Sequence, residues 1–272
     1  GVNDAGLAAG NATIFTTLDP RGFPPALTGM DLVRLALERA GTAAEAVTVV
    51  TDLIEAHGQG GSGHQGADRP YWSSFLLADP EAAWVVETSG RQWEAEAVTG
   101  TRAISNRTTI PAFDAAHRHP RQPVETLVDP RLAASRSVLS DSATPVTRSG
   151  LQAHLRSHEG GAEGWTVCMH VPEVESTTAS MVASLPRPSD GPPTAWFSLG
   201  APCRSVFVPV VVGRPIGAWP SWERFAALTD ADRPALDVLE AQLEADRSAG
   251  SGPEVIAARL ADAMHRLVPT GP

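Results

Sequence analysis

The chain of 272 residues contains no lysine, only two cysteines and no long apolar run, and each absence excludes a class of protein. Its 21 basic residues are all arginines and face 31 acidic residues, so the formal net charge is −10. Nucleic acid and anionic membrane surfaces require a basic face, and neither is expected as a partner. No apolar stretch approaches the roughly 18 residues of a membrane span.

The two cysteines, Cys168 and Cys203, are too few for a disulfide framework, which favours a reduced, cytoplasmic environment. They lack CxxC spacing, so no structural zinc site is expected, and no other metal or cofactor is predicted. Cys168 lies between two apolar residues of an expected strand and is interpreted as buried. Cys203 precedes Arg204, whose guanidinium can lower the pKa of the thiol.

Several catalytic motifs are missing. The chain has no Gly-x-Ser-x-Gly elbow and no His-Glu-x-x-His pair. The glycine-rich loop Gly58 to Gly63 lacks the Gly-Lys-Ser/Thr ending and follows a helix, so it is not a phosphate loop. His154 and His158 are four residues apart on an expected helix. They could form a metal pair, but without an evident third ligand exposed histidines are the commoner outcome.

Local signals define most of the expected elements. Asn3 to Gly6 is a turn, and Leu7 to Phe15 a buried strand. Thr28 and Thr42 each precede an acidic residue by three positions, which predicts two capped helices. The remaining strands are expected over 72–78, 82–88, 91–98, 101–105, 165–170, 177–184, 194–199 and 205–212. We expect an irregular excursion over 108–145 and helices over 146–157 and from 219 onward.

This order predicts an α+β protein of stacked antiparallel sheets covered by helices. We expect a sandwich domain over residues 1–218 and a C-terminal helical segment over 219–272 packed on it.

Two asparagines are candidates for catalysis. Asn106 follows the short strand expected over 101–105, and an amide in that place can donate a hydrogen bond to a developing oxyanion. Such a donor contributes roughly 3–4 kcal/mol to a transition state. Asn11 is the second candidate. The commoner role of an asparagine at a strand end is to terminate the strand in a turn.

Stretches along the whole chain resemble the secernin and cysteine dipeptidase family of the N-terminal-nucleophile (Ntn) hydrolases. They are Gly1 to Asn11, Leu27 to Ala40, His57 to Gly61, Ala78 to Thr88, Ile104 to Asn106, Ser176 to Ser180, Trp196 to Cys203 and Ser205 to Phe207. The resemblance implies an α-β-β-α four-layer sandwich and hydrolysis of dipeptides or small N-acyl amides. In that family a cysteine at the mature N-terminus attacks the carbonyl, with its own α-amino group as base. The resemblance also implies that Asn106 and Asn11 are oxyanion donors and that Arg204 binds substrate.

The family's nucleophilic cysteine lies upstream of the stretch that matches Gly1, so the chain resembles an N-terminally incomplete member without its nucleophile. One hypothesis is an amide hydrolase whose cysteine is supplied by an upstream segment. The alternative is a catalytically inactive, truncated relative that binds a small molecule or a partner. In either case loss of a strand exposes a sheet edge, which can pair with a second copy or with the missing segment.

Overall fold

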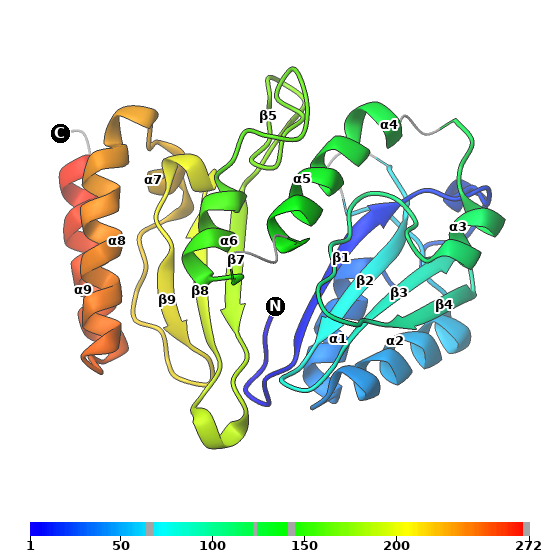
Figure 1. The fold of residues 1–272 in the computed structure, drawn as a ribbon, viewed down its shortest axis with the longest axis horizontal. Helices are drawn as coiled ribbons and strands as arrows, with labels where there is room; N and C mark the ends of the chain where they lie inside the picture. The colour runs from blue at the N-terminus through cyan, green and yellow to red at the C-terminus, as the bar shows by residue number, and fades with distance from the viewer. Residues whose placement is uncertain (64–67, 122–123, 141–144, 269–272) are drawn as a thin grey trace. The chain divides into compact units, whose positions relative to one another are not determined.

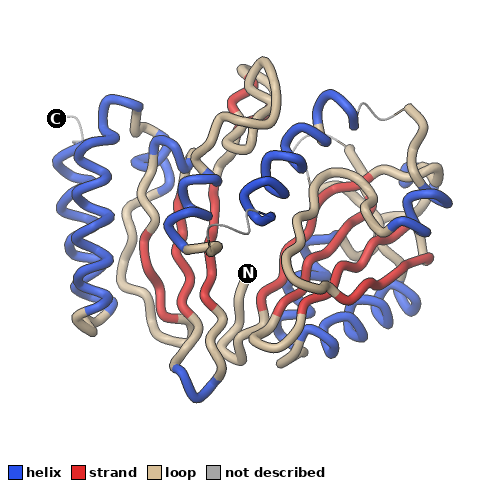
Figure 2. Tube along the Cα trace, viewed as in Figure 1, coloured by secondary structure: helices blue, strands red, loops and turns tan. Residues whose placement is uncertain are grey.

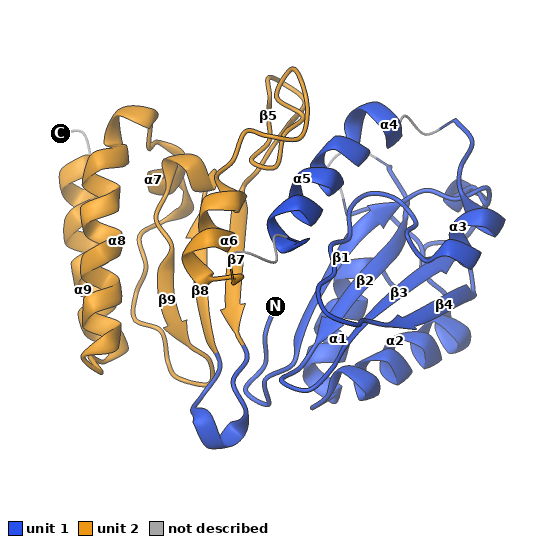
Figure 3. Ribbon diagram, viewed as in Figure 1, with its two compact units in different colours: residues 1–140, 185–193 blue, residues 141–184, 194–272 orange. Residues whose placement is uncertain are grey.

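The computed structural model describes residues 1–63, 68–121, 124–140 and 145–268 (Figure 1). Helices and antiparallel strands are mixed throughout the chain, which confirms the predicted α+β class (Figure 2). The chain divides into two compact units (Figure 3). One comprises residues 1–140 with 185–193, and the other comprises residues 141–184 with 194–272. No helix within the described ranges combines the length and the apolar character that crossing a bilayer requires.

The first unit is built on a four-stranded antiparallel sheet in the order β1-β2-β3-β4. Its strands are β1 (Ala8–Ile14), β2 (Trp72–Ala78), β3 (Ala83–Ser89) and β4 (Gln92–Ala97). Helices α1 (Gly29–Arg39) and α2 (Ala43–His57) lie along one face of the sheet (Figure 1). Their apolar side chains form one core with those of the strands, including the fully buried Leu32, Ile54 and Phe75.

Both predicted helix starts are confirmed. Thr28 accepts a hydrogen bond from the backbone of Asp31, whose carboxylate accepts one from Thr28 in return. Thr42 and Glu45 form the same reciprocal pair at the start of α2. Each box satisfies N–H groups that the first helical turn leaves unpaired. The sequence therefore determines where these helices begin without help from distant residues.

The prediction of an irregular stretch over 108–145 is wrong. It contains α3 (Pro111–His117), α4 (Val124–Leu127) and α5 (Asp129–Ser140). Its prolines do not interrupt these helices, because Pro111 occupies the first turn, where no N–H bond is lost. The strand expected over 101–105 is also wrong, since only Ser105 forms an isolated bridge, with Arg107.

A buried carboxylate joins this excursion to the sheet. Glu87 on β3 has no exposed surface. It accepts hydrogen bonds from the backbone N–H groups of Thr109 and Ile110 at 2.5 and 3.1 Å, and from the Thr109 hydroxyl at 2.8 Å. Ile110 is the N-cap residue of α3, so Glu87 satisfies donors at the start of that helix. Burial raises the pKa of Glu87, although these donors oppose the shift.

The second unit contains a three-stranded antiparallel sheet in the order β7-β8-β9 and a two-stranded ladder of β5 and β6. The strands are β5 (His170–Val171), β6 (Glu175–Ser176), β7 (Ala179–Ser184), β8 (Thr194–Leu199) and β9 (Val208–Val211). The helices are α6 (Arg148–Leu155), α7 (Trp222–Ala226), α8 (Arg233–Ser248) and α9 (Pro253–Leu267). The strand expected over 165–170 shrinks to β5, because bends occupy residues 166–168 before it.

The division of the chain differs from the one predicted at 218/219. Helices α7, α8 and α9 share a core with Val206 and Val208, and therefore belong to the same compact unit as the β7–β9 sheet. The connection from β7 to β8, residues 185–193, belongs to the first unit instead. There Arg187 forms an ion pair with Glu81 at 2.7 Å. The chain thus passes between the units three times.

Candidate functional site

Both candidate asparagines are associated with strand β1 of the first unit: Asn11 is one of its residues, and Asn106 bonds to it. Asn11 lies on β1, and its amide nitrogen is 3.4 Å from the hydroxyl oxygen of Ser73. Asn106 donates from its amide nitrogen to the carbonyl of Thr13, also on β1, at 3.0 Å. Its amide oxygen accepts a hydrogen bond from Arg131 at 3.1 Å. Both side chains are half-buried, and both are held by contacts within the unit.

Strand β1 forms one edge of its sheet. Gly1 and Ala9 exchange two backbone hydrogen bonds, N–H of Ala9 to the Gly1 carbonyl at 2.9 Å and the Gly1 amino group to the Ala9 carbonyl at 2.6 Å. Because backbone groups alternate along a strand, Asn11 and Thr13 present theirs to the same edge as Ala9. In the part of the chain that the structure describes, no strand pairs with this edge beyond the bridge of Val2 to Ala8.

Arg204, the expected substrate-binding residue, lies in the second unit next to Cys203. Its guanidinium forms a two-pronged ion pair with Asp230, with Nε 2.9 Å from Oδ1 and Nη2 3.2 Å from Oδ2. The hydrogen bond to this carboxylate raises the pKa of Arg204 and lowers that of Asp230. Arg204 also lines a hollow of about 520 Å³ together with His170 and the β5–β6 turn.

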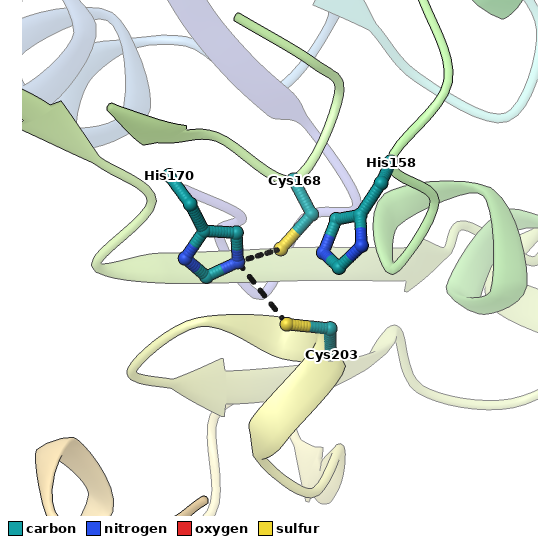
Figure 4. Close-up of side chains that lie close together, drawn as sticks. All are labelled: His158, Cys168, His170 and Cys203. Atoms are coloured by element: carbon teal, nitrogen blue, oxygen red, sulfur yellow. Dashed lines mark hydrogen bonds between the residues drawn. The ribbon is translucent and has the colours of Figure 1, made fainter. Parts of the chain in front are cut away.

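The second unit also gathers four side chains that the sequence did not suggest as a group. His158, Cys168, His170 and Cys203 converge, and one nitrogen or sulfur atom of each lies within 4.8 Å of those of the other three. The four side chains point toward one another (Figure 4). The Nε2 atom of His170 is 3.4 Å from the sulfur of Cys168 and 3.2 Å from that of Cys203. The rings of His158 and His170 meet edge to face, with centroids 5.2 Å apart.

Backbone hydrogen bonds place His158 beside Cys168. The carbonyls on either side of His158 accept from the other segment, Ser157 from Cys168 at 2.8 Å and Glu159 from Val167 at 3.0 Å. Residues 157–159 and 167–168 thus pair through their backbones, although neither segment is a regular strand. The fourth residue arrives with the short helix η3 (Pro202–Arg204), which Arg156 holds through a bond from Nε to the Pro202 carbonyl at 3.1 Å.

A glycine fixes the position of His170. Gly164 has a φ of +86°, and a Cβ atom there would lie 2.0 Å from the carbonyl oxygen of His170. The N–H of His170 donates to the carbonyl of the same glycine at 3.0 Å. Only a residue without a side chain allows the two backbones to come this close.

The pKa values of the two thiols shift in opposite directions. The pKa of Cys203 lies well below its usual range, first because the Cys168 thiol donates to it, and then because His158 and His170 do so against the effect of burial. The pKa of Cys168 is raised, first by that same interaction with Cys203 and then by burial. One thiolate beside two imidazoles is a set of donors suited to a soft or borderline metal ion.

The burial predicted for Cys168 is confirmed. The pKa of Cys203 is lowered, as expected beside Arg204, but the causes are Cys168 first and then His158 and His170. The helix expected to carry His158 ends at Leu155. The absence of CxxC spacing argued against zinc because that rule covers ligands close in sequence, whereas Cys203 arrives 33 residues after His170. The pair Cys168 and His170, two residues apart, was the available signal. No protein-family model matches this chain.

Proposed function

We propose that this chain is part of an amide-bond hydrolase of the Ntn type, acting on dipeptides or small N-acyl amides. Its nucleophile would be a cysteine on a segment upstream of Gly1. The resemblance to the secernin and dipeptidase family motivates the proposal, and the free edge of β1 is the observation that carries it. The four-layer sandwich typical of that superfamily is part of the same proposal, supported by the two antiparallel sheets with helices packed on each.

The register at the start of the chain supports an upstream strand. Val2 bridges Ala8, so a preceding segment that continued this pairing would run antiparallel to β1. Its fourth residue upstream of Gly1 would face Thr13, whose carbonyl the Asn106 amide already contacts. An upstream segment would thus extend along the free edge toward Asn106. That arrangement would bring an amide donor near a nucleophile located on the same segment or next to it.

In this mechanism the upstream cysteine attacks the substrate carbonyl, and its α-amino group takes the thiol proton. The Asn106 amide donates to the Thr13 carbonyl on β1. In the proposed mechanism this amide is the donor to the oxyanion of the tetrahedral intermediate. Loss of one such donor lowers kcat by about 10²–10³-fold.

The test uses the protein with the upstream segment that the proposal requires, assayed on a panel of dipeptides and N-acyl amides. We expect turnover that disappears when the upstream cysteine is replaced by alanine. Asn106→Asp keeps an oxygen for Arg131 but removes the donor, and should lower kcat and kcat/KM together, since the bond is made only in the transition state. A melting temperature for each variant separates loss of donation from loss of folding.

Absence of turnover across the panel, or turnover that survives replacement of the cysteine, would contradict the proposal. The chain would then be better explained as a non-catalytic binding module. In that case Asn11 and Asn106 would contact a bound ligand, in addition to their bonds with Ser73 and Thr13.

A further inference from the structure

We propose that His158, Cys168, His170 and Cys203 bind one structural zinc ion that holds together the irregular part of the second unit. The site lies wholly within that unit, and it stands independently of the proposed hydrolase activity.

The distances fit a tetrahedral ion. With Zn–S bonds of about 2.3 Å and Zn–N bonds of about 2.0 Å, a sulfur and a nitrogen on one tetrahedron are about 3.5 Å apart. The His170 nitrogen is 3.4 and 3.2 Å from the two sulfurs. All four donor atoms lie within 4.8 Å of one another, so small side-chain rotations suffice to close the tetrahedron. Two thiolates and two imidazoles are a ligand set that zinc occupies in structural sites.

The number of ligands indicates a structural role. A catalytic zinc keeps one position open for water or substrate, whereas four protein ligands close the coordination sphere. A catalytic thiol and its histidine base would need only one residue of each kind. In this cluster a second cysteine and a second histidine converge on the same point, which a thiol nucleophile does not require.

The surrounding fold explains what the ion would do. Between the end of α6 at Leu155 and the start of β7 at Ala179, a stretch that the structure describes throughout, the only regular structure is the pair of two-residue strands β5 and β6. Cys168 is the one fully buried apolar residue of this segment. With so few apolar contacts, a cross-link of three ligands from the segment to Cys203 on η3 would supply cohesion that packing does not.

The first experiment measures metal content. The chain is purified with a histidine-free tag, under reducing conditions and without chelators, and its zinc is determined by elemental analysis after dialysis. We expect about one zinc per chain. Replacement by cobalt should give thiolate-to-cobalt charge transfer and the intense visible bands of a tetrahedral ion. No bound zinc after reconstitution, or a cobalt spectrum of octahedral, thiolate-free type, would overturn the proposal even if no variant were made.

Variants then assign the ligands. Cys203→Ser and His158→Ala should each weaken zinc binding by at least about 100-fold, measured by competition with a chromophoric chelator. His265→Ala is the matched control, because His265 is an exposed histidine of the same unit on α9, outside the cluster, and should bind zinc as the unaltered chain does. Equal affinities for all three variants would contradict the assignment.

A third measurement tests the structural role. Removal of zinc by a chelator should increase hydrogen exchange and proteolysis within residues 157–178 and leave the β1–β4 sheet unchanged. An unchanged exchange pattern in that segment would refute the structural role of the ion. Rapid alkylation of Cys203 in zinc-loaded protein would refute the ligand assignment, since a coordinated thiolate is protected.

Discussion

Glu87 provides the sharpest test of how the Asn106 region is held. Replacing it with alanine removes the acceptor of two backbone N–H groups and one hydroxyl. The hydroxyl can rotate toward another partner, but the N–H groups of Thr109 and Ile110 have fixed directions. Each donor left unpaired in a buried site costs about 1–3 kcal/mol. We therefore expect Glu87→Ala to lower the free energy of unfolding by about 3–5 kcal/mol, a large share of the stability of an ordinary domain.

Glu87→Gln is a milder change, because the amide keeps one acceptor oxygen, and we expect a loss of about 1–2 kcal/mol. Its pH dependence follows from the raised pKa of Glu87. When the pKa of a carboxyl group is higher in the folded state, the free energy of unfolding of the protein falls as the pH rises from about 4.3 through that raised value. Glutamine does not titrate, so the difference between the original chain and Glu87→Gln should shrink over the same interval.

The assay is urea unfolding followed by tryptophan fluorescence and circular dichroism, with hydrogen exchange at the Thr109 and Ile110 amides. Glu94→Ala is the matched control, because Glu94 is the cross-strand neighbour of Glu87 on β4 but is exposed. Its effect should stay within about 0.5 kcal/mol. Equal effects of Glu87→Ala and Glu94→Ala, or unchanged exchange at the two amides, would refute the reasoning.

Two further predictions concern single contacts. Burial alone raises the pKa of Asp79, but bonds from three backbone N–H groups outweigh it and hold the pKa below its ordinary value. Asp79→Asn should therefore lower the free energy of unfolding by about 1 kcal/mol at about pH 7. This loss should become smaller as the pH drops below about 3.9 through the depressed pKa. Urea unfolding at several pH values measures both. On α8, Leu239→Ala should lower the free energy of unfolding by about 2–5 kcal/mol, because Leu239 is buried. The side chain of Val238 is 59% exposed, so Val238→Ala should change that energy by no more than about 0.5 kcal/mol. Equal losses in thermal unfolding would contradict the packing described for that helix.

The features predicted correctly from the sequence are local. The starts of α1 and α2 depend on residues three positions apart, Thr28 with Asp31 and Thr42 with Glu45, so the signal lies within one turn of chain. The strands β1, β2 and β3 were found from apolar runs bounded by turn residues. The helices α3 to α5 are absent from the prediction because this stretch is rich in proline, histidine and arginine, although Pro111 stands where a helix accepts it.

The features that were missed depend on distant residues. Glu87 meets its partners 22 and 23 positions further on, and nothing around it in the sequence distinguishes a buried carboxylate from an exposed one. The Cys and His cluster needs Cys203, which only the folding of β7 and β8 returns to the earlier ligands. Asn106 was a candidate from its place after an expected strand, and the resemblance supported both Asn106 and Asn11. The structure adds that both contact residues of the first sheet.

The three passages of the chain between the units affect synthesis as well as architecture. Residues 185–193 complete the first unit but follow β7, which belongs to the second. A ribosome making about 5–20 residues per second needs several seconds to proceed from Ser140 to Pro193. During that interval the β1–β4 sheet is already complete, but the first unit still lacks residues 185–193. The first unit therefore cannot finish folding until β7, a strand of the second unit, has been made.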